Sequence, residues 1–448
     1  MKLYDTKSRQ LKETTVANGL LTIYCCGPTV YRDAHVGNLR TFMLADLISR
    51  VAELNGNKVT LIQNITDVGH MSEDFTGDDK ILAQATIERK SPLEIARKYE
   101  EEFHKDLSNL NIKKANAYPR ASESIELMQS MIAELVDKGF AYVGGDKTVY
   151  FDAQKFETYG AISGNKLDSL IPGHKFESHN DGAKRFHADW ALWKTAGDRR
   201  EMIWDSPWGP GFPGWHIECS AMSMDLLDRH VDVHVGGIDL RFPHHENERA
   251  QSNAVIGQEA VDVWVHGEHL LFEGRKMSKS SGNVVLVSDI TKRGIDPLAL
   301  RLCFLENRYR SQMDLTWNSI TAAHETLKRW RNKMASWSQS STISSDPEME
   351  AAFNNDLDTP KVILRLREIE KSNLDNKGDL FRYADQVLGL DLGRPIVARE
   401  LTQQMQELLD ERTKARSEKR WADSDALRLQ LENLGLVIKD TAEGQSWS

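Results

Sequence analysis

The 448-residue chain has few cysteines, no long apolar run and no glycine-rich phosphate loop. Its four cysteines are irregularly spaced and no secretory signal opens the chain, so we expect reduced thiols and a cytoplasmic location. The longest apolar runs, such as residues 284–287, are far too short to cross a bilayer, and no membrane association is expected. The pattern Gly-x-x-x-x-Gly-Lys-Ser/Thr does not occur, so a P-loop ATPase or kinase has no support.

Acidic side chains outnumber basic ones by 67 to 57, so the formal net charge is −10 at pH 7. Net charge does not locate patches, however. Residues 411–420 carry five basic side chains against two acidic ones, and residues 328–333 hold a second basic cluster. Each cluster is either a solvated helix face or a nucleic-acid contact, and composition alone does not decide between them.

Two segments that are far apart in the sequence predict a single ATP site. The first, the His35 segment (residues 35–38), follows an apolar run and opens a helical pattern, where backbone N–H groups and the helix dipole can meet a polyphosphate. The second, the lysine segment (residues 276–280), supplies two cations that can neutralise charge on departing pyrophosphate. Alone, each would be a helix cap or a solvated loop, but together they predict adenylation. The expected catalytic residues are His35, Asn38, Lys276 and Lys279, with Gly37 and Met277 also contacting ATP.

A second group of residues has the chemistry of a metal site. His244 and Glu248 are four residues apart, so they project from one face of a helix. With Cys26 and Cys219 they make a plausible tetrahedral zinc set of two thiolates, an imidazole and a carboxylate. A free cysteine alone is usually a small buried hydrophobe, so only the combination favours metal binding. Cys25 points to the opposite face of its strand from Cys26 and is not assigned to the metal.

The order of elements predicts an α/β fold with a Rossmann-like parallel sheet. Residues 21–26, 37–54 and 58–65 show the patterns of a strand, a helix and a strand, which form a βαβ unit. Residues 231–235 and 261–266 add two more strands. The ligand crevice of such a sheet lies at the carboxyl ends of its strands. Gly236, Gly237 and Asp239 follow one strand end, where they either contact the adenosine or form a plain turn.

With these motifs the chain resembles the class I aminoacyl-tRNA synthetases, with Asn38 in place of the final histidine of their first signature. Within that class it resembles the cysteinyl-tRNA synthetases, from Leu3 to Trp447. The resemblance implies one zinc per chain, held by the four residues above and binding the thiolate of substrate cysteine. Zinc would prefer a thiolate to the alcohol of serine, whereas an apolar pocket separates near-isosteres by only about 10- to 200-fold.

The resemblance also implies L-cysteine, ATP with Mg²⁺ and tRNA(Cys) as partners, and a monomeric protein. Thr66 and Trp215 are candidates for holding the amino group and flanking the side chain of cysteine. Arg416, Trp421, Asp425 and Asp440 are expected to contact unpaired anticodon bases. The expected parts are residues 1–114 and 207–318 as the two halves of the catalytic domain, 115–206 as a connective insertion, 319–395 as a helical tRNA-binding domain, and 396–448 as a C-terminal anticodon-recognition module.

Two alternatives remain at this point. A related ligase could transfer activated cysteine to a sugar amine, but it would not need the module at residues 396–448. A non-catalytic RNA-binding paralogue would be expected to lose metal or phosphate contacts, and none of the motifs above is lost.

Overall fold

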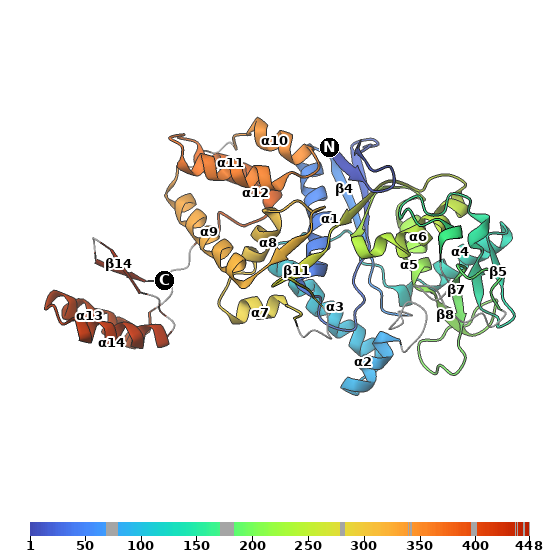
Figure 1. Cartoon of the computed structure of the whole chain (residues 1–448), viewed down its shortest axis with the longest axis horizontal. Coiled ribbons are helices and arrows are strands. Elements are labelled where there is room, and N and C mark those ends of the chain that lie inside the picture. Colours follow the sequence, from blue (N-terminus) through green and yellow to red (C-terminus); the bar gives the residue numbers. More distant parts are fainter. Residues whose placement is uncertain are drawn as a thin grey trace. The chain divides into compact units, whose positions relative to one another are not determined.

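A computed structural model describes residues 1–68, 79–170, 183–277, 283–338, 340, 343–395, 401–434, 436, 438–441 and 444–447. The chain divides into two compact units, Met1–Gly393 and Arg394–Ser448 (Figure 1). None of the helices in these described ranges is long and apolar enough to cross a membrane.

The centre of the first unit is a four-stranded parallel sheet with the order β10-β9-β3-β4. Its strands are β3 (Leu20–Cys25), β4 (Lys58–Gln63), β9 (Val231–Gly237) and β10 (Val261–Gly267), which confirms the predicted α/β fold. Strand β4 lies on one side of β3, and β9, which comes later in the chain, lies on the other side of β3. The order therefore reverses between β3 and β9, and the carboxyl ends of these two strands border a crevice.

Helix α1 (Val36–Leu54) connects β3 to β4 and packs against all four strands of this sheet. Most of its residues from Leu39 to Ala52 are buried, because α12 (Lys377–Leu388) covers another face of the helix. Asp46 is held in this core by two guanidinium groups, with Arg50 Nε at 2.9 Å and Arg301 Nη2 at 2.6 Å. Opposite charges in such contact lower the pKa of the buried Asp46 carboxyl, against the effect of its burial. These ion pairs anchor the middle of α1 in the core.

A long insertion separates β4 from β9. It begins with α2 (Lys80–Glu88), α3 (Pro92–Asn109), a short 3-10 turn (Ala121–Glu123) and α4 (Ile125–Asp137). An antiparallel sheet of β5 (Ala141–Val143), β6 (Val149–Phe151), β7 (Trp190–Thr195) and β8 (Gly211–Pro213) follows. Two further 3-10 turns, Ala153–Lys155 and Leu167–Ser169, lie between β6 and β7. Helix α5 (Trp215–Leu226) then leads back to β9 and packs on α6 (His244–Ile256), which follows the 3-10 turn Ile238–Arg241.

The remaining elements of the first unit surround the sheet and α1. Strands β1 (Lys2–Asp5) and β2 (Gln10–Glu13) form a hairpin, and β11 (Leu270–Phe272), β12 (Arg275–Lys276) and β13 (Met313–Leu315) form a small sheet. The helices are α7 (Val287–Lys292), α8 (Leu298–Leu305), α9 (Trp317–Ser336), α10 (Pro347–Asn354), α11 (Thr359–Lys371) and α12. Cys303 lies on α8 within the main hydrophobic core.

The second unit is a helical hairpin with a two-stranded antiparallel sheet. Its elements are α13 (Gln403–Ser417), α14 (Trp421–Asn433), β14 (Ile438–Thr441) and β15 (Gly444–Trp447). A small apolar cluster that includes Leu409 and Leu431 holds the two helices together. A core of this size leaves few interior groups, so most side chains of the unit face solvent.

Candidate active site

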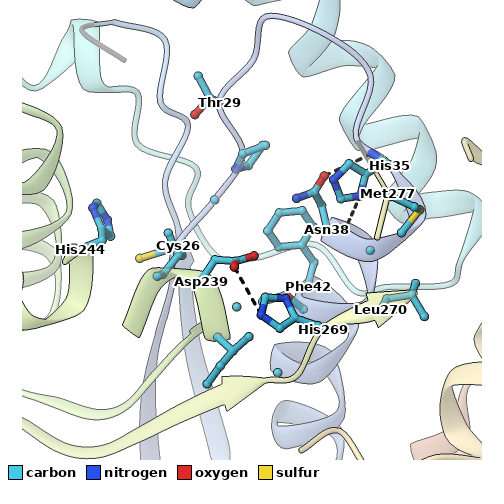
Figure 2. Close-up of a pocket in the computed structure, with 18 of the residues that line it drawn as sticks. Cys26, Thr29, His35, Asn38, Phe42, Asp239, His244, His269, Leu270 and Met277 are labelled. Atoms are coloured by element: carbon cyan, nitrogen blue, oxygen red, sulfur yellow. Dashed lines mark hydrogen bonds and ion pairs between the residues drawn. The ribbon is translucent and has the colours of Figure 1, made fainter. Parts of the chain in front are cut away.

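A cavity of about 480 Å³ opens at the carboxyl ends of β3 and β9, beside the amino end of α1 (Figure 2). Both segments predicted to bind ATP reach it, through His35, Gly37, Asn38, Lys276 and Met277. The same cavity is lined by Cys26, Trp215, Gly237, Asp239 and His244. Lys279 lies outside the described residues. The fold thus brings most of the predicted ATP-contacting residues to one space with two of the four predicted metal ligands.

His35 and Asn38 form a reciprocal cap at the start of α1. His35 is the N-cap residue, and its Nδ1 accepts a hydrogen bond from the backbone N–H of Asn38 at 3.3 Å. The Asn38 Oδ1 in turn accepts from the backbone N–H of His35 at 3.3 Å. A side chain with a carbonyl oxygen at this position can therefore close the capping box, which explains why asparagine fits where related signatures carry histidine.

The His35 ring is neutral at physiological pH. Burial, reinforced by the nearby Arg32 guanidinium, lowers the pKa of His35 to about 4. Because Nδ1 is an acceptor in the cap, the ring proton resides on Nε2. His35 can thus donate one hydrogen bond to a phosphate oxygen, but it does not bring the full positive charge of an imidazolium.

A pH titration of His35 tests this assignment. The assigned ring signal of His35 in a carbon-13 histidine NMR spectrum is expected to show no inflection as pH falls from 8 to 5, and a His35→Gln variant identifies the signal. Because the folded pKa is depressed, the neutral ring's contribution to stability is complete above the unfolded pKa of about 6.5 and is lost as pH falls toward the folded value. An inflection near pH 6.5 would show that the ring is not held in the cap.

The lysine segment contacts the His35 segment where the structure describes both. Met277 is buried, and its Cε would lie 3.0 Å from a Cβ placed on Gly37, so a larger residue at position 37 would displace it. Figure 2 shows Met277 beside His35, and shows Asp239 near His269 on the other side of the cavity. The Asp239 carboxylate lies 3.6 Å from His269 Nε2 and is largely exposed, so it remains available to a ligand. Gly236 is not among the described lining residues, and a Cβ placed on it would lie 2.5 Å from the His245 ring.

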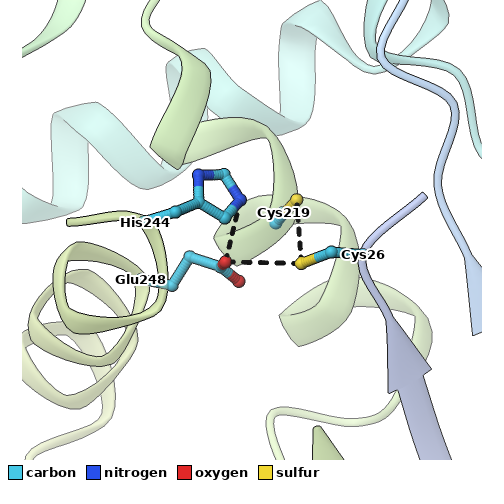
Figure 3. A group of neighbouring side chains, drawn as sticks. All are labelled: Cys26, Cys219, His244 and Glu248. Carbon is cyan, nitrogen blue, oxygen red and sulfur yellow. Dashed lines mark hydrogen bonds and ion pairs between the residues drawn. The ribbon is translucent and has the colours of Figure 1, made fainter. Parts of the chain in front are cut away.

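The four predicted metal ligands converge (Figure 3), and two of them, Cys26 and His244, line the cavity. Cys26 follows β3, Cys219 lies on α5, and His244 and Glu248 lie one turn apart on α6. All four are buried, and their ligand atoms lie within 4.8 Å of one another. The Cys26 Sγ is 3.8 Å from the Cys219 Sγ and 3.5 Å from the Glu248 Oε1, which is 3.0 Å from the His244 Nε2.

These distances and donors suit a tetrahedral zinc ion. Zn–S bonds of about 2.3 Å and Zn–O bonds of about 2.1 Å place two sulfurs about 3.8 Å apart and a sulfur and an oxygen about 3.6 Å apart. Burial raises the pKa of Cys26 and of Glu248 well above their usual values, so these ligands gain their charge only with a compensating cation. Burial also acts to raise the pKa of Cys219, but hydrogen bonds with Cys26 and His244 outweigh it and lower that pKa to about 7. The His216 Nδ1 contacts the His244 Nδ1 at 2.9 Å and orients the ring.

The sequence did not single out two further histidines that border this group. His245 Nε2 and His234 Nε2 lie 3.3 and 3.5 Å from the Cys26 Sγ, so Cys26 and Glu248 also belong to a second possible ligand set. His245 is tied on its other side to His266 at 2.8 Å. The alternation of β9 could have identified His234, because its side chain lies on the opposite face of the strand from Val233 and Val235. Unlike His244, neither histidine is among the described residues of the cavity wall.

Comparison with known proteins decides the family. Residues 12–325 match the model described as tRNA synthetases class I (C) catalytic domain, and residues 398–447 match the Cysteinyl-tRNA ligase anticodon binding domain. The chain is 40% identical to cysteine-tRNA ligase 1 of Burkholderia lata and 37% identical to the cysteine-tRNA ligase of Chlamydia caviae, each with 99% of this chain and 96% of the relative covered. The chain belongs to the cysteinyl-tRNA ligase family.

Membership of the cysteinyl-tRNA ligase family confirms the resemblance found in the motifs, and it makes the chain a class I aminoacyl-tRNA synthetase. The fold agrees. Mycobacterium tuberculosis methionyl-tRNA synthetase in complex with methionyl-adenylate superposes with a TM-score of 0.57 over 83% of this chain and 88% of that chain, at 14% sequence identity. At that identity the likeness concerns the fold alone.

The two residues predicted to contact cysteine lie at different depths. Trp215 lines the cavity, and its ring centroid is 4.2 Å from that of His244. Thr66 is 2% exposed and is not among the described lining residues. It lies behind the loop at residues 27–29, where its backbone N–H donates to the Pro28 carbonyl at 3.0 Å. Trp215 thus faces the cavity, and Thr66 is hydrogen-bonded to the loop that lines it.

In the family's anticodon-binding region, the structure places the predicted residues on the second unit. Arg416 Nη1 lies 2.9 Å from Asp440 Oδ1, and the buried Arg412 holds the same carboxylate with two contacts of 3.0 Å. These cations lower the pKa of Asp440. Trp421 is 56% exposed, and Asp425 follows it by one turn on α14, so both belong to one face of that helix.

Proposed function

We propose that this chain activates L-cysteine with ATP and transfers the cysteinyl group to the 3′ end of tRNA(Cys), with one bound zinc that selects the cysteine thiolate. The observation that carries the proposal is the shared cavity, because the ATP segments and the metal-capable side chains Cys26 and His244 line the same space. An amino acid bound through its side chain near those two residues would direct its carboxylate toward the amino end of α1. That is the position in which a carboxylate can attack the α-phosphate of ATP.

Zinc would be held by Cys26, Cys219, His244 and Glu248. This set is favoured over the overlapping one with His234 and His245, because it includes two soft thiolates and because Cys26 and His244 reach the cavity. When bound, zinc would supply a soft Lewis acid that prefers a thiolate to an alcohol. The protein's part is to exclude water from the site and to hold the ligands in register, and Trp215 would cover the substrate side chain from above His244.

The ATP end of the cavity would stabilise the charge that develops on the phosphates. His35 would donate from Nε2 to a phosphate oxygen, with its ring orientation fixed by Asn38. Lys276 and Lys279 would neutralise the departing pyrophosphate, to which Mg²⁺ is bound. Gly237 and Asp239 would contact the adenosine. The second step is the attack of the terminal ribose hydroxyl of tRNA on the adenylate carbonyl.

The second unit would read the anticodon. Arg416 and Asp440 present hydrogen-bonding groups in a fixed arrangement, and the exposed Trp421 offers a stacking surface to an unpaired base. Asp425 would add an acceptor from the same face of α14. Reading of the anticodon and activation of cysteine would thus be carried by separate compact units of the chain.

Pyrophosphate exchange with ATP tests the proposal most directly. With purified protein, exchange is expected to require L-cysteine, to proceed without tRNA and to ignore L-serine, and esterification is expected with a tRNA(Cys) transcript. A ligase for a sugar amine would activate cysteine but would not charge the transcript. A non-catalytic RNA-binding protein would give neither reaction. The three functions are therefore distinguished by which of the two reactions occurs.

A further inference from the structure

Three hydrogen bonds in series run behind the cavity wall. The backbone N–H of Gly27 donates to Asn64 Oδ1 at 2.8 Å, and the Asn64 Nδ2 donates to Thr66 Oγ1 at 3.2 Å. The Thr66 hydroxyl then donates to Glu218 Oε2 at 3.1 Å. We name this series of four residues the Glu218 relay. None of its side chains was assigned to metal or ATP above.

The relay connects the two elements that carry the thiolate ligands. Gly27 directly follows Cys26, and Glu218 directly precedes Cys219. The two sulfurs come from parts of the chain almost two hundred residues apart, and they lie 3.8 Å from each other. The backbones that position them belong to the loop after β3 and to helix α5. Hydrogen bonds that connect Gly27 to Glu218 therefore constrain the distance between the two thiolate ligands.

The relay has a fixed direction and little freedom. Because Asn64 Oδ1 is occupied by the Gly27 N–H, the amide must donate to Thr66, and the single hydroxyl proton of Thr66 must then go to Glu218. The series needs an acceptor at its end. Asn64, Thr66 and Glu218 are at most 2% exposed, so water does not compete for these groups. A Cβ on Gly27 would lie 1.6 Å from the backbone oxygen of Asn64, which shows how closely the segments approach.

A carboxyl group at position 218 would lower the stability of the fold if packing were its only role. Its carboxyl is fully buried, burial raises its pKa well above the usual value, and its Oε1 makes no hydrogen bond to the described part of the chain. A buried polar group without a full set of partners lowers stability, and an apolar side chain of similar shape avoids that cost. Stability alone therefore gives no reason for a carboxyl here, whereas the relay requires an acceptor.

We propose that Glu218 is a positioning residue that, through Thr66 and Asn64, holds the Cys26 loop against helix α5 and so sets the affinity of the metal site and of the adjoining cysteine site. The inference rests on the proposed zinc role of Cys26 and Cys219. Without the acceptor, the Thr66 hydroxyl and the Asn64 amide are free to turn, and the loop at residues 27–29 loses its tie. Groups that orient metal ligands from behind typically change metal affinity by about 10- to 100-fold when they are removed.

The test compares Glu218→Met, which keeps the shape but has no strong acceptor, with Glu218→Gln, which keeps a carbonyl oxygen for Thr66. In the full-length protein, zinc affinity is measured by competition with a chelator, and the KM values for cysteine and ATP by pyrophosphate exchange. Glu218→Met is expected to bind zinc about 10- to 100-fold more weakly and to raise the KM for cysteine, with the KM for ATP unchanged. The metal-free variant is expected to unfold at the same temperature as the metal-free wild type or a higher one. Glu218→Gln is expected to recover most of the zinc affinity.

The outcomes separate this inference from the proposed function. If wild-type protein binds no zinc, the proposed metal role fails. If the wild type binds zinc and Glu218→Met binds it equally well, the relay does not position the ligands. If Glu218→Gln is as weak as Glu218→Met, an oxygen acceptor at position 218 does not restore the site, and the relay is also overturned. Should Glu218→Met fail to fold, Thr66→Val interrupts the relay without altering α5, and it is expected to weaken zinc binding in the same range.

Discussion

Replacing Cys219 by Ser is expected to remove most of the bound zinc and to abolish cysteine-dependent pyrophosphate exchange. The Cys219 sulfur is one of two thiolates in the group, and the pKa of about 7 lets it ionise more readily than a free thiol. An alcohol does not ionise near neutral pH and is a poor zinc ligand. Removing a group that only orients a metal ligand already lowers metal affinity by about 10- to 100-fold, so removing a ligand itself should lower the affinity by more.

Zinc per chain, determined by elemental analysis, and exchange rates would be measured together for this variant. Cys303→Ser is the matched control, since Cys303 is also a buried thiol but lies on α8 in the main core, away from the metal group. It is expected to keep one zinc and normal exchange. Full activity in Cys219→Ser with stoichiometric loss of metal would remove zinc from the mechanism. Loss of activity with full zinc content would assign the metal to the set of His234, His245, Cys26 and Glu248 instead.

The sequence was sufficient to predict which elements meet at the site. Strand and helix periodicity identified β3, α1, β4, β9 and β10, and parallel strands expose their carboxyl ends at one edge. Cys26 and Asp239 follow two of those ends, so their approach to one cavity follows from the order of elements. The four-residue spacing of His244 and Glu248 likewise placed both on one face of α6.

Depth within the fold was harder to predict. Thr66, in a buried stretch after β4, was predicted to contact substrate, and in the fold its backbone N–H donates to the Pro28 carbonyl of the loop at residues 27–29. Gly236 was predicted either to contact the adenosine or to form a plain turn, and in the fold a Cβ at this position would lie 2.5 Å from the His245 ring. Periodicity defines the face on which a side chain lies, whereas its distance from a cavity depends on which loop covers it. The Glu218 relay could not be foreseen for the same reason, because its hydrogen bonds join residues from separate segments.

The charge of His35 depends on surroundings that the sequence does not encode locally. A histidine before a helix was expected to help stabilise phosphate charge, and an isolated imidazole titrates near pH 6.5. In the fold, burial and Arg32 keep the ring neutral, and Asn38 occupies its Nδ1. Its contribution is thereby limited to one directed hydrogen bond, which leaves the positive charge of the ATP site to lysines.

The two compact units predict a separation of the two half-reactions. Deleting residues 394–448 is expected to leave cysteine-dependent pyrophosphate exchange largely intact, because every proposed zinc and ATP residue lies within Met1–Gly393. The cut preserves the core of the first unit, where Arg331 donates to the backbone oxygens of Leu390 and Asp391 at 2.9 and 3.0 Å. Transfer to tRNA is expected to fall sharply.

The loss should appear mainly as a raised KM for tRNA, because distant contacts that bind ground and transition states alike change KM before kcat. Aminoacylation would be measured with wild-type transcripts and with transcripts that carry altered anticodon bases. The intact protein is expected to discriminate between them, and the truncated protein to do so only weakly. Trp421→Ala is a milder version of the same test, since loss of base stacking costs about 1–3 kcal/mol per base, or about 5- to 150-fold in KM. If the truncated protein rejects altered anticodons as strongly as the intact one, the anticodon is read by the first unit, and the roles proposed for Arg416, Trp421, Asp425 and Asp440 are wrong.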